Sequence, residues 1–89
     1  MKIEQKKVKI EERIADRVMK EVARIFKKDA SVITRDTRFV EDLKAKSLNI
    51  VELIALLQDE FEIEIPYGEA KRRKTVGEAI DLVITIRKR

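Results

Sequence analysis

Apolar residues recur every three or four positions in three separate stretches of this 89-residue chain. This spacing places them on one face of an α-helix, whereas a strand would require strict alternation. A chain of this length buries only about 60–65% of its unfolded surface, so it forms one domain with a modest core. We therefore expect residues 1–89 to form a single small all-α domain.

The first helix is expected over roughly residues 6–28, with an apolar stripe that begins at Ile14. Just before it, Val8 and Ile10 alternate with charged residues, so residues 1–7 form either the first turns of this helix or a frayed N-terminal arm. A long connection follows and reaches about Lys46. A loop of this length has to be held by its own apolar side chains. These are Phe39, Val40 and Leu43.

Three further helices are expected after the loop. The second helix has Ser47 as its N-cap and ends near Phe61, because Pro66 disfavours helical geometry in the residue before it. A short third helix covers about residues 67–72, since proline is accepted in the first turn of a helix. Thr75 caps the last helix, whose basic C-terminal end complements the helix dipole. The expected fold is a small four-helix bundle with three longer helices, one short helix and a long first loop.

The chain contains no cysteine and no histidine. It therefore has no disulfide, no soft-metal site and no imidazole that could activate a nucleophilic serine. We expect no catalytic residue and no bound metal, and hence no enzyme. No apolar stretch reaches the roughly 20 residues needed to cross a bilayer, and the charged N-terminus does not resemble a secretory signal. These features predict a cytoplasmic protein that does not insert into membranes.

The net charge of +4 is unevenly distributed along the chain. Residues 1–38 contain twelve Lys and Arg against seven Asp and Glu, residues 39–66 contain two against seven, and residues 67–89 contain seven against three. A nucleic-acid-binding domain would gather its basic residues into one stripe beside aromatic side chains, and the four aromatic residues here form no such motif. We therefore expect most of this charge on solvated helix faces and no nucleic-acid partner.

Three blocks of the sequence resemble the acyl carrier protein family, in the family's order and spacing. The first is FVEDLKAKSL at residues 39–48, similar to the family's F-x-E-D-L-G-A-D-S-L, and it continues as NIVEL at residues 49–53. The second is DEFEIEIP at residues 59–66, and the third is TVGEAID at residues 75–81. The resemblance extends from about Val18 to Ile84, and three blocks in register make it specific.

The resemblance implies a carrier rather than an enzyme. In the family, the serine of the D-S-L triplet receives 4′-phosphopantetheine from coenzyme A, and the thiol of this arm holds acyl groups as thioesters. That serine corresponds to Ser47. A phosphodiester at the start of a helix is favoured by free backbone N–H groups and by the helix dipole. The resemblance thus implies a phosphoprotein of fatty acid biosynthesis, or of a specialised lipid or polyketide pathway.

The resemblance also implies partners and an acyl pocket. The partners are a phosphopantetheinyl transferase and acyl-transferring, fatty-acid or polyketide synthase-type enzymes, which meet a monomeric carrier at its acidic surface. The expected partner-contact residues are Glu41, Asp42, Lys46, Leu48, Glu52 and Asp59. Family members can part their helices to admit an acyl chain. The expected pocket residues are Val51, Ile54, Leu57, Phe61, Ile65, Val76 and Ile80, and together with Leu48 they are the expected core.

The sequence departs from the family pattern near the modification site, as a divergent, basic member would. Lys44 and Lys46 stand where the family has glycine and aspartate, residues 71–74 are KRRK, and an apolar residue is usual at the position of Arg73. Like charges are an effective means of rejecting partners, so we expect a specialised carrier with its own set of enzymes.

Two alternatives to a modified carrier remain. One is an unmodified carrier-like module that only binds other proteins, and the other is a basic domain that binds nucleic acid or an anionic membrane. The presence of Glu41, Asp42 and Ser47 together argues against the second, because those residues would serve no purpose there.

Overall fold

The computed structural model describes the backbone of residues 2–89 and the side chains of residues 9–89. Within this part of the chain there is no strand, only an isolated antiparallel bridge between Arg38 and Thr75. The expected all-α architecture is confirmed. Its elements are α1 (Lys2–Phe26), the 3₁₀ turn η1 (Ala30–Val32), α2 (Ser47–Phe61), α3 (Tyr67–Ala70) and α4 (Val76–Lys88).

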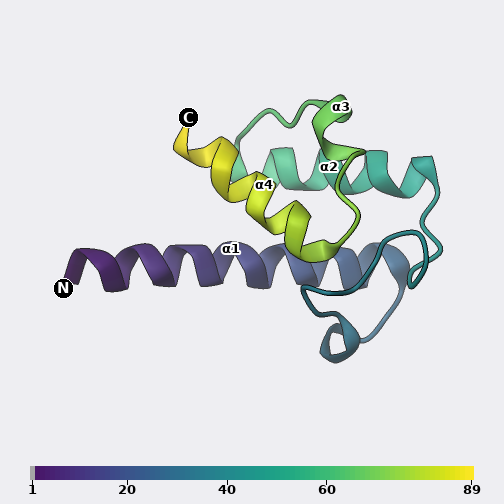
Figure 1. Cartoon of the computed structure of the whole chain (residues 1–89), viewed down its shortest axis with the longest axis horizontal. Helices are drawn as coiled ribbons and strands as arrows, with labels where there is room; N and C mark the ends of the chain where they lie inside the picture. The colour runs from purple at the N-terminus through teal and green to yellow at the C-terminus, as the bar shows by residue number, and fades with distance from the viewer. Residues whose placement is uncertain (1) are drawn as a thin grey trace.

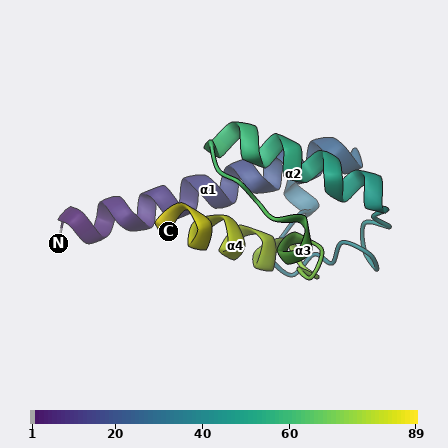
Figure 2. The ribbon, with the colours of Figure 1, turned by 90° about the horizontal axis from the view of Figure 1, so that it is seen from above.

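Helices α2 and α4 pack against helix α1. In both views the N-terminal turns of α1 extend beyond them (Figures 1 and 2). Helix α1 begins at Lys2 rather than near Lys6, so residues 2–7 continue the helix, and Met1 lies outside the described residues. It ends at Phe26 because Lys27 turns into the left-handed conformation with φ 55°, a common helix stop, and the Lys28 N–H closes back on the Ala23 carbonyl at 2.9 Å.

The core consists of apolar side chains from the three longer helices and from the loops between them. Its fully enclosed members are Val18, Val22, Val76, Ile80 and Val83. No polar or charged residue is buried among the described side chains. The fold is therefore stabilised mainly by apolar burial, at roughly 25 cal/mol for each Å² removed from water.

The predicted core of α2 is only partly correct. Of the residues predicted for the core, Leu57 in α2 is buried, and Ile54 and Phe61 pack against the core. Outside α2, Ile65, Val76 and Ile80 are buried as predicted. Leu48 and Val51, however, are 69% and 48% exposed, and Leu53 is the second buried residue of the helix. At about 100° per residue, Val51 lies about 200° around the helix from Leu53 and therefore faces outward. Because α2 is apolar on both faces, its sequence pattern did not reveal which face is inside.

The long loop is joined to the start of α4 by backbone hydrogen bonds. The Phe39 N–H donates to the Lys74 carbonyl at 3.0 Å, the Val76 N–H to the Thr37 carbonyl at 2.9 Å, and the Gly77 N–H to the Arg35 carbonyl at 2.8 Å. The loop is also pinned by side chains: Phe39 and Leu43 are buried as predicted, whereas Val40 is 66% exposed and does not pin it.

The close approach of the loop to α4 predicts an effect of a single methyl group at Gly77. A Cβ at this position would lie 2.9 Å from the Arg35 carbonyl oxygen and 3.0 Å from the Arg35 Cβ, so the backbone of the loop would have to move. We expect Gly77→Ala to lower the free energy of unfolding by roughly 1–3 kcal/mol in urea denaturation.

Gly68 provides the matched control, because it lies in α3 and nothing lies within 4 Å of a Cβ built there. Gly68→Ala is expected to be neutral or to stabilise by up to about 1 kcal/mol, as alanine does in an open helical position. Equal stability changes for the two variants would contradict the close contact between loop and helix.

Candidate functional site at the start of helix α2

Ser47 is exposed and is the first residue of α2. The prediction that it caps the helix is wrong by one residue, because Lys46 holds the extended N-cap conformation, with φ −111° and ψ 165°. A lysine side chain has no acceptor for helix N–H groups. The turn is tied instead by Asn49, whose Oδ1 accepts from the Lys46 N–H at 2.9 Å. Because Lys46 is the N-cap, Ser47 occupies the first helical position and not the capping position.

The first backbone N–H groups of α2 have no partner within the helix. The regular helical bonding starts only at Ile50, whose N–H donates to the Lys46 carbonyl at 3.2 Å. The free N–H groups before it carry the positive end of the helix dipole. The start of this helix therefore favours a phosphate attached at the Ser47 hydroxyl.

A hollow of about 190 Å³ opens beside Ser47. Its walls come from the long loop, the start of α2, and the region of α3. Three of its lining residues are cations, namely Lys46, Lys71 and Arg73. Tyr67 adds a phenol, and the rest of the lining is apolar apart from Ser47 itself. A lining that combines cations, a phenol and apolar side chains fits a phosphorylated arm that carries an apolar group.

A second, apolar cavity of about 30 Å³ lies between α2, α3 and α4. Ile54, Leu57 and Ile65 line it, as expected for an acyl pocket, whereas Val51, Phe61, Val76 and Ile80 do not. Its volume is about the share of one water molecule, so the helices would have to part to admit a longer guest. The lining residues that sequence analysis did not name as pocket residues are Phe39, Ile50, Leu53, Ala70, Arg73, Ala79, Leu82 and Val83.

The surface around Ser47 combines exposed apolar and charged residues. Leu48 and Val51 are exposed on α2, where the sequence predicted core, and Val40 is exposed on the loop. Glu41, Lys46, Glu52 and Asp59 are exposed as well.

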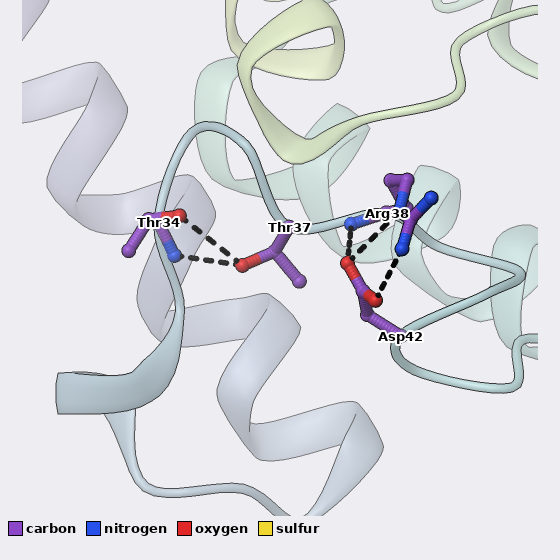
Figure 3. Close-up of polar contacts among 4 residues, drawn as sticks. All are labelled: Thr34, Thr37, Arg38 and Asp42. Atoms are coloured by element: carbon purple, nitrogen blue, oxygen red, sulfur yellow. Dashed lines mark hydrogen bonds and ion pairs between the residues drawn. The ribbon is translucent and has the colours of Figure 1, made fainter.

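Asp42, the remaining predicted contact residue, is engaged locally by Arg38 (Figure 3). Its Oδ2 accepts from the Arg38 backbone N–H at 2.8 Å, and its Oδ1 accepts from the Arg38 guanidinium at 3.1 Å. These hydrogen bonds, the side-chain bond foremost, hold the pKa of the Asp42 carboxyl below its usual value. A few residues earlier, the Thr34 N–H donates to the Thr37 hydroxyl at 2.9 Å, which folds the loop back on itself (Figure 3).

Lys44 adopts the left-handed conformation with φ 56°. Glycine reaches this region without steric cost, whereas other residues are disfavoured there by about 1–2 kcal/mol. The glycine typical of the family at this position therefore has a conformational reason. In this chain a lysine takes the same backbone shape.

The comparisons with known proteins agree with this geometry. Residues 16–83 match the family described as the phosphopantetheine attachment site. Acyl carrier proteins from Rickettsia canadensis and Rickettsia rickettsii are each 44% identical over 72 residues, which cover 81% of this chain and 84% of theirs. The solved structure of the acyl carrier protein from Enterococcus faecalis superposes with a TM-score of 0.73 at 30% identity, over 85% of this chain and 96% of that one.

The fold and the site thus define a small helical carrier domain. The chain belongs to the acyl carrier protein family. It is a carrier protein and not an enzyme, and its cofactor is a covalently attached 4′-phosphopantetheine. Over the residues that the structure describes, none of the helices combines the length and apolar character that a membrane span requires.

The Arg38–Asp42 contact predicts a measurable pH dependence. Folding lowers the pKa of Asp42, so the ionised carboxylate stabilises the folded state at pH values above the pKa that Asp42 has in the unfolded chain, near 4. This stabilisation is lost as the pH falls through the pKa that Asp42 has in the folded chain. In Arg38→Ala the side-chain bond disappears and the backbone bond stays. We expect the pKa of Asp42 to rise part of the way to its usual value, as followed by NMR titration of the carboxyl carbon.

Asp29 is the internal control for this titration. Its pKa is lowered by a hydrogen bond from the Ser31 N–H, which Arg38→Ala does not touch, so it should not change. An unaltered pKa of Asp42 in the variant would show that the guanidinium does not stabilise this carboxylate in solution.

Proposed function

We propose that this chain carries acyl groups as thioesters on a 4′-phosphopantetheine arm attached to Ser47, in fatty-acid synthesis or in a specialised lipid or polyketide pathway. The observation that carries the proposal is the position of Ser47. Its hydroxyl is exposed, stands at the free N–H groups of a long helix, and borders a hollow with cations. The arm supplies the thiol, and the residues around Ser47 orient the arm and offset the charge of its phosphate.

The chain contains two serines, and their settings differ. Ser31 lies in the 3₁₀ turn after α1, where its N–H donates to the Asp29 carboxylate at 2.9 Å. A carboxylate at that turn would repel a phosphate. Ser47 has Lys46 beside it and Lys71 across the hollow, so the electrostatic setting favours phosphate attachment at Ser47 over Ser31.

The proposed partner surface surrounds Ser47. Leu48 and Val51 are exposed apolar residues of α2, and a side chain of this kind is suited to contact with a phosphopantetheinyl transferase or an acyl-transferring enzyme. Glu41, Glu52 and Asp59 would act at the rim, where charges mainly set association rates and select partners. Asp42 is bound to Arg38, so we propose that it contributes mainly through the shape of the loop.

Modification at Ser47 is directly testable. Co-expression with a phosphopantetheinyl transferase is expected to raise the intact mass by one phosphopantetheine. Ser47→Ala removes the attachment oxygen, so its mass is expected to stay unchanged under the same conditions.

Ser31→Ala serves as the matched control and is expected to be modified like the wild type. A wild-type chain that stays unmodified with several transferases would contradict the proposal and favour an unmodified interaction module.

Lys46 is proposed to select the transferase. Before attachment, its ammonium repels a basic or metal-bearing site that is suited to the aspartate usual at this position. We expect Lys46→Asp to be modified roughly 3- to 10-fold faster by a transferase of the fatty-acid type. The gain should be largest at low ionic strength, where surface charges are least screened.

Lys9→Asp makes the same charge change at an exposed position in the N-terminal part of α1, which lies at the opposite end of the molecule from the start of α2 (Figure 1), and should leave the rate near that of the wild type. If Lys46→Asp and the wild type react equally at every salt concentration, Lys46 does not select the transferase. The search for selectivity would then move to residues 71–74.

A further inference from the structure

The hollow beside Ser47 is positively charged. Of the described residues that line it, three are cations and none is a carboxylate. The three are Lys46, Lys71 and Arg73, which we call the cationic lining. Lys46 and Lys71 are exposed to solvent, whereas Arg73 is half-buried. An enzyme that acts on an arm at Ser47 has to approach this hollow, so it meets the cationic lining directly.

The charge of the cationic lining is not neutralised within the part of the chain that the structure describes. None of the ion pairs between described side chains includes a residue of the cationic lining. Arginines on other surfaces are paired, for example Arg17 with Glu60 and Arg35 with Asp81 at 2.7 Å. The positive charge beside Ser47 is therefore available to a partner.

The carboxylates that are near the cationic lining in the sequence do not face into the hollow. Glu69 lies two residues before Lys71, and its carboxylate accepts a hydrogen bond from the Arg89 guanidinium at 3.3 Å. Glu41 on the loop and Glu52 on α2 are exposed, but they do not line the hollow. A carboxylate that enters the hollow from another molecule would thus meet only cations among its charged neighbours.

The same hollow also presents apolar surface. Val40 and Tyr67 line it and are 66% and 44% exposed. Aromatic and apolar side chains next to charged ones are typical of contacts between proteins. A nucleic acid would instead be expected to bind a long stripe of basic residues that follows its backbone. The combination favours a protein as the partner of the cationic lining.

We propose that the cationic lining is a docking surface for enzymes that carry Asp and Glu side chains around the entrance to their active sites. The family resemblance implies the opposite polarity, in which an acidic carrier meets its partners. Opposite charges across an interface raise the association rate, and like charges reject other partners. The assignment rests on the proposed attachment at Ser47 and specifies the chemistry of the enzymes that would use it.

The test measures the binding of the wild-type chain to two forms of one phosphopantetheinyl transferase of the fatty-acid type. One form is native, and in the other the basic residues around the active-site entrance are replaced by glutamate. At low ionic strength we expect the wild-type chain to bind the glutamate form roughly 10-fold more tightly, as measured by isothermal titration calorimetry. The preference should fade near 1 M salt, where the screening length falls to about 3 Å.

Two double variants separate the cationic lining from the net charge. Lys46→Glu with Lys71→Glu changes two exposed residues of the lining, leaves the half-buried Arg73 in place, and should reverse the preference towards the native form. Lys9→Glu with Arg13→Glu makes the same total change of charge on exposed residues of α1, in the half that extends away from the start of α2 (Figure 1). This control should keep the preference of the wild type.

The outcomes are distinguishable, because binding and modification are read separately. A chain whose intact mass never rises with any transferase overturns the proposed function and this assignment with it. If the mass rises but the chain binds both forms alike, binds neither, or loses its preference in the control variant, only the docking surface is overturned. A short DNA duplex that binds the wild-type chain as tightly as the glutamate form does would assign the cationic lining to nucleic acid and would also overturn it.

Discussion

The backbone hydrogen bonds between the long loop and the start of α4 determine the shape of the functional end of this molecule. They hold Phe39 in register with Lys74, and the buried ring of Phe39 becomes a wall of both the hollow and the cavity. The Phe39 carbonyl then accepts from the Ala45 N–H at 2.9 Å, two residues before Ser47. A continuous set of backbone contacts thus runs from α4 through the loop to Ser47. Apart from the 3₁₀ turn η1 the loop contains no helix, and its position is nevertheless fixed by these hydrogen bonds.

Electrostatic contacts contribute less to the fold than their number suggests. In the ion pairs Arg17–Glu60 and Arg35–Asp81, for example, the side chains are between about one third and two thirds exposed. Pairs of this kind are typically worth 0–1 kcal/mol and weaken with salt. The apolar core of α1, α2 and α4 therefore carries most of the stability. Arg73 differs from these exposed charged residues. Within the part of the chain that the structure describes, its Nε is enclosed by protein and has no hydrogen-bond partner.

Much of the fold could be predicted from helical periodicity and capping. The range of α2 and the Thr75 cap, whose hydroxyl accepts from the Glu78 N–H at 3.1 Å, agree with the expectation. The errors have local reasons. Lys46 takes the N-cap conformation although lysine is not a capping residue. Ser47 was therefore predicted as the N-cap, whereas it is the first residue of the helix. Leu48 and Val51 look like core residues in a pattern that is apolar all around the helix.

The site itself could be predicted only in part. The motif predicted Ser47 as the attachment residue, but the hollow and the cavity are lined by residues far apart in the chain, such as Phe39 and Arg73, which no local pattern brings together. The departure at Arg73 was visible in the sequence. Its enclosed Nε was not, because the burial of a single atom depends on how elements distant in sequence pack together. Likewise, the left-handed backbone at Lys44 explains why glycine is usual at this position in the family. A lysine does not predict this conformation, so the sequence did not indicate it.

The separation between the outer surface and the inner wall has a consequence for how such carriers diverge. Leu48, Val51 and Glu52 are exposed, while Arg73 is half-buried and lines the apolar cavity. Substitutions on the outer surface can therefore alter recruitment by one enzyme or another without changing the interior. A substitution at position 73 changes the lining of both the cavity and the hollow beside Ser47, while Leu48, Val51 and Glu52 stay as they are. Natural variation can therefore change the exposed face of α2 and the lining of the two spaces one at a time.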